Sequence, residues 1–232
     1  MGVIVAHKYF MFRMTDYKIT KTQLEEAQLA IPNIEFRLPI NQPTGNFFYD
    51  PWIIKDEFKN TIWEDILNTI PEAKGEARII KLDPGTCYRS HADIDDRWHL
   101  SLKGEKSFIV DLENERMRPT RPDSIWHMID TGVRHSAVNF GHVPRLQLVV
   151  RQLLTRNVLI NPKQISITLK TIVDDRRFIF DDLVSPWLNK MSKCGRITDF
   201  QYEEFEVKLT IEENEIDNLK SIINSHFNVT VL

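Results

Sequence analysis

The chain lacks any apolar run that approaches the ~20 residues needed to cross a membrane as a helix. Its first residues also lack a basic segment followed by a long apolar region, so no secretion signal is predicted. Hydrophobic residues make up 42% and charged residues 27% of the 232 residues, which is ordinary for a globular protein. We therefore expect a cytoplasmic protein that does not associate with a membrane.

The chain also lacks a strong excess of either charge. Its 30 lysines and arginines against 33 acidic residues leave a formal net charge of -3. Nucleic-acid-binding proteins usually carry a basic field that attracts the phosphate backbone, and this sequence provides none over its whole length. We therefore expect no nucleic-acid partner.

Cysteine is scarce, since only Cys87 and Cys194 occur, far apart in the chain. This spacing forms neither a CxxC motif nor a dense disulfide framework, and it is typical of a reducing compartment. Free cysteines usually behave as small apolar residues, so we expect both to be buried.

The first seventy residues are expected to form two helices around an irregular stretch. An apolar strand is expected near residues 9–14. Residues 20–29 contain strong helix formers, with threonines near their start that could cap a helix. In residues 53–70, apolar side chains recur every four positions, which predicts an amphipathic helix ended by Pro71. Proline and glycine interrupt the segment 33–54, for which no regular structure is expected.

Residues 76–151 are rich in short β-forming segments separated by turn residues, a pattern typical of a sandwich or barrel. The connections leave no room for crossover helices, so the sheets should be mostly antiparallel. The arginine- and proline-rich segment 114–122 is expected to be a solvated loop or a lid over the active site. The expected strands are residues 77–82, 88–93, 97–102, 107–112, 125–129, 133–140 and 145–151.

A second, smaller domain is expected at 157–232, after a first domain at 1–156. Alternation at Ile165, Ile167 and Leu169 predicts a strand, and residues 174–193 are expected to be helical in part. The segments after them show strand spacing and then helix spacing. The resulting β-α-β-α-β pattern suits a small two-layer αβ unit. Its role is open, and it is a candidate surface for a protein partner.

Five of the seven histidines lie between residues 91 and 142. His91 and Asp93 are separated by one residue, so on an extended strand both side chains would point to the same face and offer two metal ligands. His135 is the predicted third ligand because Arg145 follows ten residues later. His127 lies at a plausible distance too and remains an alternative third ligand.

Two histidines and one carboxylate on one face of an octahedral ion leave three open positions, an arrangement associated with non-haem Fe(II) oxygenases. Zinc sites prefer four tetrahedral ligands, usually richer in sulfur or nitrogen. The open positions would admit a chelating 2-oxo acid and dioxygen. Arginine offers a fixed fork of donors to the far carboxylate of such an acid, and a turn at 141–144 would bring Arg145 beside His135.

These residues resemble the aspartyl/asparaginyl β-hydroxylase-like group of Fe(II)- and 2-oxoglutarate-dependent oxygenases, which includes proline 3-hydroxylase-type enzymes. The resemblance covers about residues 45–152. It is carried by Arg89-Ser-His-Ala-Asp93, Arg97-Trp-His99 and the segment Trp126-His-Met-Ile-Asp-Thr-Gly-Val-Arg-His-Ser-Ala-Val-Asn139 with Arg145.

The resemblance implies a mainly β protein with a double-stranded β-helix, a cupin-like jelly roll, flanked by helices and followed by the small αβ unit. It also implies Fe(II), 2-oxoglutarate and O2, with succinate and carbon dioxide as products. On this basis His91, Asp93 and His135 are the catalytic metal ligands. Arg145 would bind 2-oxoglutarate, with further contacts from Arg97 and His99.

One departure bears on the substrate. The peptidyl branch of the group lacks the carboxylate ligand, whereas this chain has Asp93 and so looks closer to the branch that acts on free amino acids. We expect hydroxylation of an amino acid, either free or as an Asp, Asn or Pro residue of a peptide or protein. The alternatives are a non-oxidative cupin-like metalloenzyme and a metal-containing binding module.

Other polar and aromatic residues near the motif have simpler interpretations. His99 could be a hydrogen-bonded core imidazole. Asp95 and Asp96 are expected to be solvated loop charges. Trp98 and Trp126 are expected in the core.

Overall fold

We describe a computed structural model of the chain, which is mainly β with several antiparallel sheets, as predicted. Contacts divide the chain into two compact units, one of Met1–Arg89 with Asp95–Leu153 and one of Leu154–Leu232 with Ser90–Ile94. The structure describes residues 11–91, 93, 95–112, 114–131, 134–154, 159–169, 188, 191–192, 196–203, 206–223 and 227–232.

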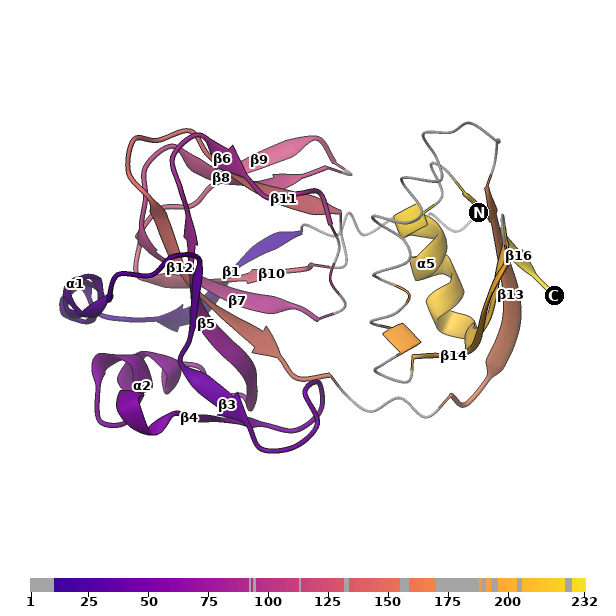
Figure 1. Cartoon of the computed structure of the whole chain (residues 1–232), viewed down its shortest axis with the longest axis horizontal. Helices are drawn as coiled ribbons and strands as arrows, with labels where there is room; N and C mark the ends of the chain where they lie inside the picture. Colours follow the sequence, from indigo (N-terminus) through magenta and orange to yellow (C-terminus); the bar gives the residue numbers. More distant parts are fainter. Residues whose placement is uncertain are drawn as a thin grey trace, which may run out of the picture. The chain divides into compact units, whose positions relative to one another are not determined.

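Two larger antiparallel sheets form the first unit, and Figure 1 shows them as separate groups of strands. The six-stranded sheet has the order β1 (Phe12–Lys18), β10 (Ile125–Ile129), β7 (Arg97–Lys103), β12 (Arg145–Gln152), β5 (Lys74–Leu82) and β2 (Arg37–Pro39). The four-stranded sheet has the order β6 (Thr86–Cys87), β11 (His135–Asn139), β8 (Ser107–Asp111) and β9 (Arg116–Pro119). Strands β3 (Asn41–Pro43) and β4 (Trp52–Ile54) pair separately.

One face of the six-stranded sheet is apolar and is covered by α1 (Lys21–Ala30) and α2 (Ile62–Leu67), which flank the sheet in Figure 1. Burial of this surface is the main favourable contribution to folding of the unit. The cluster includes Leu24 and Ala27 of α1, Trp63, Ile66 and Leu67 of α2, and the sheet residues Trp98, Leu100, Trp126, Leu148 and Val150.

The opposite face of the same sheet carries polar side chains. Because successive strand residues point to opposite faces, the residues of β7 and β12 that alternate with the apolar ones share this second face. A small apolar cluster that includes Leu82, Ile109 and Ala137 joins it to the four-stranded sheet. The polar residues on this face of β7 and β12 are Arg97, His99, Ser101, Arg145, Gln147 and Arg151.

The start of α1 is fixed by a reciprocal cap. The Thr20 hydroxyl accepts from the Gln23 N–H at 3.1 Å, and the Gln23 side chain accepts from the Thr20 N–H at 2.9 Å. We expect Thr20→Ala to lower the free energy of unfolding by about 1 kcal/mol, as measured by urea denaturation. Thr22→Ala is the matched control, because Thr22 is exposed inside the helix and alanine is the better helix former. Equal stability of the two variants would contradict a stabilising cap.

Several sequence predictions are wrong in residues 33–122. The segment 33–54 was expected to have no regular structure, but it contains β2, β3 and β4. Residues 88–93 were expected to form a strand, but β6 ends at Cys87 and only His91 makes an isolated bridge among the described residues that follow. The expected loop 114–122 contains β9, which pairs with β8 at the sheet edge, where Pro119 need not donate a ladder hydrogen bond. The expected helix 53–70 is reduced to α2 because its first residues pair in β4 and Thr61 caps the helix.

Cys87 is exposed, contrary to the expectation of burial, because it lies on the two-residue edge strand β6. Cys194 lies outside the described residues.

The second unit contains a four-stranded antiparallel sheet with α5 (Ile216–Ile223) lying against it (Figure 1). The sheet order is β14 (Ile197–Glu203), β15 (Glu206–Glu212), β13 (Pro162–Leu169) and β16 (Phe227–Val231). Ile165, Leu209 and Leu219 belong to its core. The sequence pattern missed β14, and most of the helical segment expected at 174–193 lies outside the described residues. In the described part of the chain, no helix is long and apolar enough to cross a membrane.

Candidate metal centre

Three predicted ligands lie together. One ligand atom from each of His91, Asp93 and His135 lies within 4.8 Å of the others, and among the described residues this is the group that could hold a metal ion. The His91 Nε2 atom is 3.5 Å from Asp93 Oδ2. Asp93 and His135 are buried, whereas the His91 side chain is 40% exposed. The group therefore has two buried ligands and one that solvent can reach.

The register of β6 against β11 explains why these residues meet. Cys87 lies opposite Val138, and continuing the antiparallel pairing by three residues places Ser90 opposite His135. Two hydrogen bonds support this pairing beyond β6, from the Tyr88 N–H to the Ala137 carbonyl at 2.9 Å and from the Ser136 hydroxyl to the Tyr88 carbonyl at 2.6 Å. His91 follows directly.

The donor set suits a divalent transition metal with open coordination positions. Two imidazoles and one carboxylate form the 2-His-1-carboxylate set found in non-haem Fe(II) sites. Donor atoms bound at about 2.0–2.2 Å to one ion lie at most about 4.4 Å apart, so small side-chain rotations would close the group around a metal. The residues present therefore fit the predicted ion.

His99 is held in a defined protonation state beside this group. Its Nδ1 lies 3.0 Å from Gln147 Oε1, and the same oxygen accepts a hydrogen bond from Arg145. Because arginine can only donate, this oxygen is an acceptor and His99 must donate from Nδ1, which leaves Nε2 without a proton. Burial lowers the pKa of His99 well below its ordinary value; the hydrogen bond with Gln147 opposes this shift, and the nearby charges of Arg145 and Arg97 add to it. His99 is thus a neutral, hydrogen-bonded imidazole.

Arg145 is 1% exposed and carries its charge in the interior. Its Nε donates to the Thr120 hydroxyl at 3.3 Å, and one terminal nitrogen donates to Gln147. Burial lowers the pKa of Arg145 to about 10, so the side chain remains a cation at neutral pH. Within the described part of the chain no carboxylate forms an ion pair with Arg145. A buried cation without an anion is costly, so this position favours an anionic ligand.

The sequence predicted Asp95 to be a solvated loop charge, and this prediction is wrong. The residue is only 2% exposed. Its Oδ2 accepts from Arg151 Nε at 2.7 Å and from Arg97 Nε at 3.2 Å. Burial raises the pKa of the neighbouring Asp96 to about 6, with Asp130 nearby adding to the rise, so this carboxyl is also not fully solvated. The contacts of Asp95 with Arg97 and Arg151 hold it against β7 and β12. The predicted contact of Arg97 with 2-oxoglutarate stays a prediction.

The remaining candidates take ordinary structural places. His127 is outside the metal-ligand group, with its Nε2 2.9 Å from Asp123 Oδ2 and its ring 5.1 Å from that of Phe12. Trp98 and Trp126 lie in the core, as predicted.

Sequence reasoning missed Gln147 and Thr120, which hold Arg145. Gln147 had a detectable signal, since it follows Arg145 by two residues on a strand and must share its face. Neither a comparison with models of known protein families nor one with curated proteins finds a match for this chain. The geometry of the site and the sequence motif are therefore the features that bear on function.

Proposed function

We propose that the protein is an Fe(II)- and 2-oxoglutarate-dependent dioxygenase that hydroxylates an unactivated carbon of an amino acid, either free or within a peptide. Two observations carry the proposal: the ligand atoms of His91, Asp93 and His135 lie close together, and the cation of Arg145 is buried. The three-residue group offers a metal site with open positions, and Arg145 offers a partner for a carboxylate.

The strand order supports a cupin-like jelly roll, the double-stranded β-helix of the proposal. From β5 to β12, strands β5, β7, β10 and β12 belong to one sheet, and β6, β8, β9 and β11 belong to the other. Eight antiparallel strands that pass between two facing sheets in this way are the arrangement of a jelly roll. The metal group and the polar face of the six-stranded sheet would then both belong to its interior.

Each residue has a defined task in this proposal. Fe(II), when bound, supplies the activation of dioxygen, which no side chain can provide. His91, Asp93 and His135 would hold the ion, and a set of three protein ligands would leave coordination positions for 2-oxoglutarate and dioxygen. Arg145 pairs with the far carboxylate of 2-oxoglutarate, while Gln147 and Thr120 fix the orientation of its guanidinium group. One oxygen atom enters the substrate, and the other enters succinate as carbon dioxide leaves.

A non-oxidative metalloenzyme is the main competing proposal, because the same three ligands could serve hydrolysis or isomerisation. The buried charge of Arg145 favours the oxygenase, since hydrolysis at the metal requires no carboxylate co-substrate. A binding module would require no open metal positions.

We expect the full chain loaded anaerobically with Fe(II) to develop a weak visible charge-transfer band when 2-oxoglutarate is added. With oxygen, the same protein should release succinate. His142→Ala is a suitable control, because His142 is an exposed histidine outside the metal group and its loss should leave the band unchanged. If the metal-loaded wild type shows neither band nor succinate, the proposed function is wrong.

A further inference from the structure

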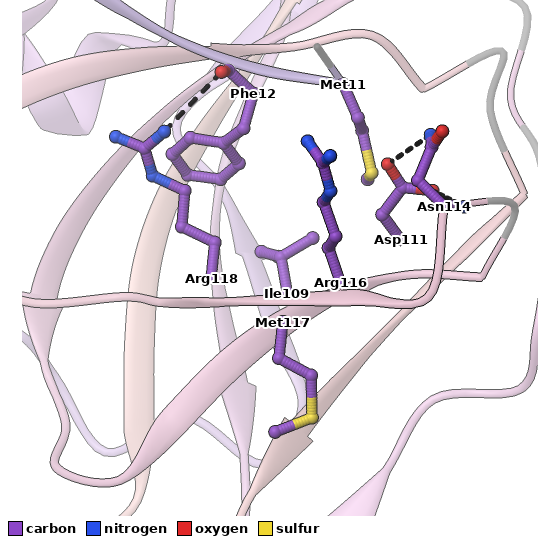
Figure 2. A pocket seen from close by; sticks show the side chains of 8 residues that line it. All are labelled: Met11, Phe12, Ile109, Asp111, Asn114, Arg116, Met117 and Arg118. Atoms are coloured by element: carbon purple, nitrogen blue, oxygen red, sulfur yellow. Dashed lines mark hydrogen bonds between the residues drawn. The ribbon is translucent and has the colours of Figure 1, made fainter.

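The first unit contains a pocket of about 240 Å³ between the start of β1 and the four-stranded sheet. Figure 2 shows its walls, with Met11 and Phe12 on one side, Ile109 and Asp111 from β8, and Arg116 and Arg118 from β9. Sites for drug-sized ligands usually measure about 300–1,000 Å³, so this pocket suits a smaller molecule or a single residue.

The pocket begins next to a predicted metal ligand. Asp111 lies directly opposite His135 in the β8–β11 ladder, so the two side chains point to the same face and are close neighbours. Asp111 is held in place by Asn114, whose backbone N–H and side-chain amide donate to its two oxygens at 3.0 and 2.8 Å. A ligand in this pocket would therefore lie one strand away from His135.

The pocket is lined by two guanidinium groups and one carboxylate. Arg116 and Arg118 alternate along β9, and Figure 2 shows both side chains rising toward β1 while Met117 points the other way. The Arg118 guanidinium lies 4.3 Å from the centre of the Phe12 ring, which fixes its orientation. Its one hydrogen bond in the described part of the chain is a long one, 3.5 Å to the Phe12 carbonyl. Most donors of its fork therefore remain for an anion.

We infer that this pocket binds a carboxylate of the substrate and that Arg118, with Arg116, selects for it. The inference rests on the proposed function, because it is the position beside His135 that makes the ligand a substrate. Planar guanidinium groups match carboxylates with paired hydrogen bonds, and Met11, Phe12 and Ile109 provide an apolar wall for the carbon skeleton. The carboxylate is the α-carboxylate of an amino acid or an acidic side chain.

The test is direct binding to the full chain, measured by ligand-observed NMR. The probes are L-proline, L-leucine, L-aspartate and L-glutamate, each beside its α-amide. We expect at least one acid to bind, and Arg118→Gln to weaken that binding about tenfold or more. Arg116→Gln should also weaken binding of the acid. Because Arg116 is exposed, this variant provides the test if Arg118→Gln does not fold. Arg121→Gln is the matched control, since Arg121 is exposed and outside the pocket lining, and it should bind like wild type.

The α-amides distinguish the two sources of the carboxylate. Loss of binding by an α-amide assigns the α-carboxylate, whereas retained binding by the α-amides of aspartate and glutamate alone assigns the side chain. Equal binding of all acids and amides, no binding of any acid, or unchanged affinity in both arginine variants would overturn the inference. Arginine-dependent binding without any 2-oxoglutarate turnover would instead overturn only the proposed function.

Discussion

Asp93→Gly is expected to reduce succinate release from 2-oxoglutarate by more than about 100-fold, because even the outer partners of metal ligands contribute 10–100-fold. Asp93 is the carboxylate of the proposed three-residue metal group, and it is 2% exposed. Two imidazoles would remain, which should also weaken Fe(II) binding. Titration of the metal-free protein with Fe(II), followed by a succinate assay, measures both effects.

Asp83→Gly is the matched control for this variant. Asp83 is an exposed carboxylate whose ion pair with Lys81, at 3.0 Å, lies at the surface and contributes little to stability. It should retain both metal binding and turnover. Full turnover by Asp93→Gly would show that the site works with two histidines alone, as in the carboxylate-free peptidyl branch, and would refute the three-ligand proposal.

Local pattern was sufficient for the strands that build the polar face. Strands β7, β8, β10 and β12 were found within one or two residues of their predicted bounds, because each is a short β-forming run that ends near glycine, proline or charged residues. Strand β9 was missed because it is an edge strand with two arginines and a proline, and its packing depends on Phe12, which lies far earlier in the chain. Contacts between distant segments leave no mark in a local pattern.

The three predicted ligands lie together, but not for the reason inferred from the sequence. The sequence pattern predicted His91 and Asp93 on one face of a strand. Strand β6 ends before them, and the pairing of Tyr88 with β11 brings them near His135. The burial of Asp95 could not be predicted, because it depends on Arg151. A residue's burial is decided by partners that only the fold supplies.

Arg145→Met is expected to raise the KM for 2-oxoglutarate by about 100-fold or more, since two hydrogen bonds between charged groups contribute about 1.5–3 kcal/mol each. Fe(II) binding should remain, because Arg145 is not among the three ligands. The KM of Arg145→Lys for 2-oxoglutarate should lie between those of Arg145→Met and the wild type. Lysine keeps the positive charge but lacks the forked guanidinium group that reaches both Thr120 and Gln147.

The anaerobic charge-transfer band, titrated with 2-oxoglutarate, separates this effect from a loss of metal. Arg37→Met on β2 is the matched control, because Arg37 is an exposed arginine of the same sheet. If Arg145→Met binds 2-oxoglutarate as wild type does, the buried cation serves another anion. The same metal group would then fit the non-oxidative enzyme better, because the chief argument for a carboxylate co-substrate would be gone.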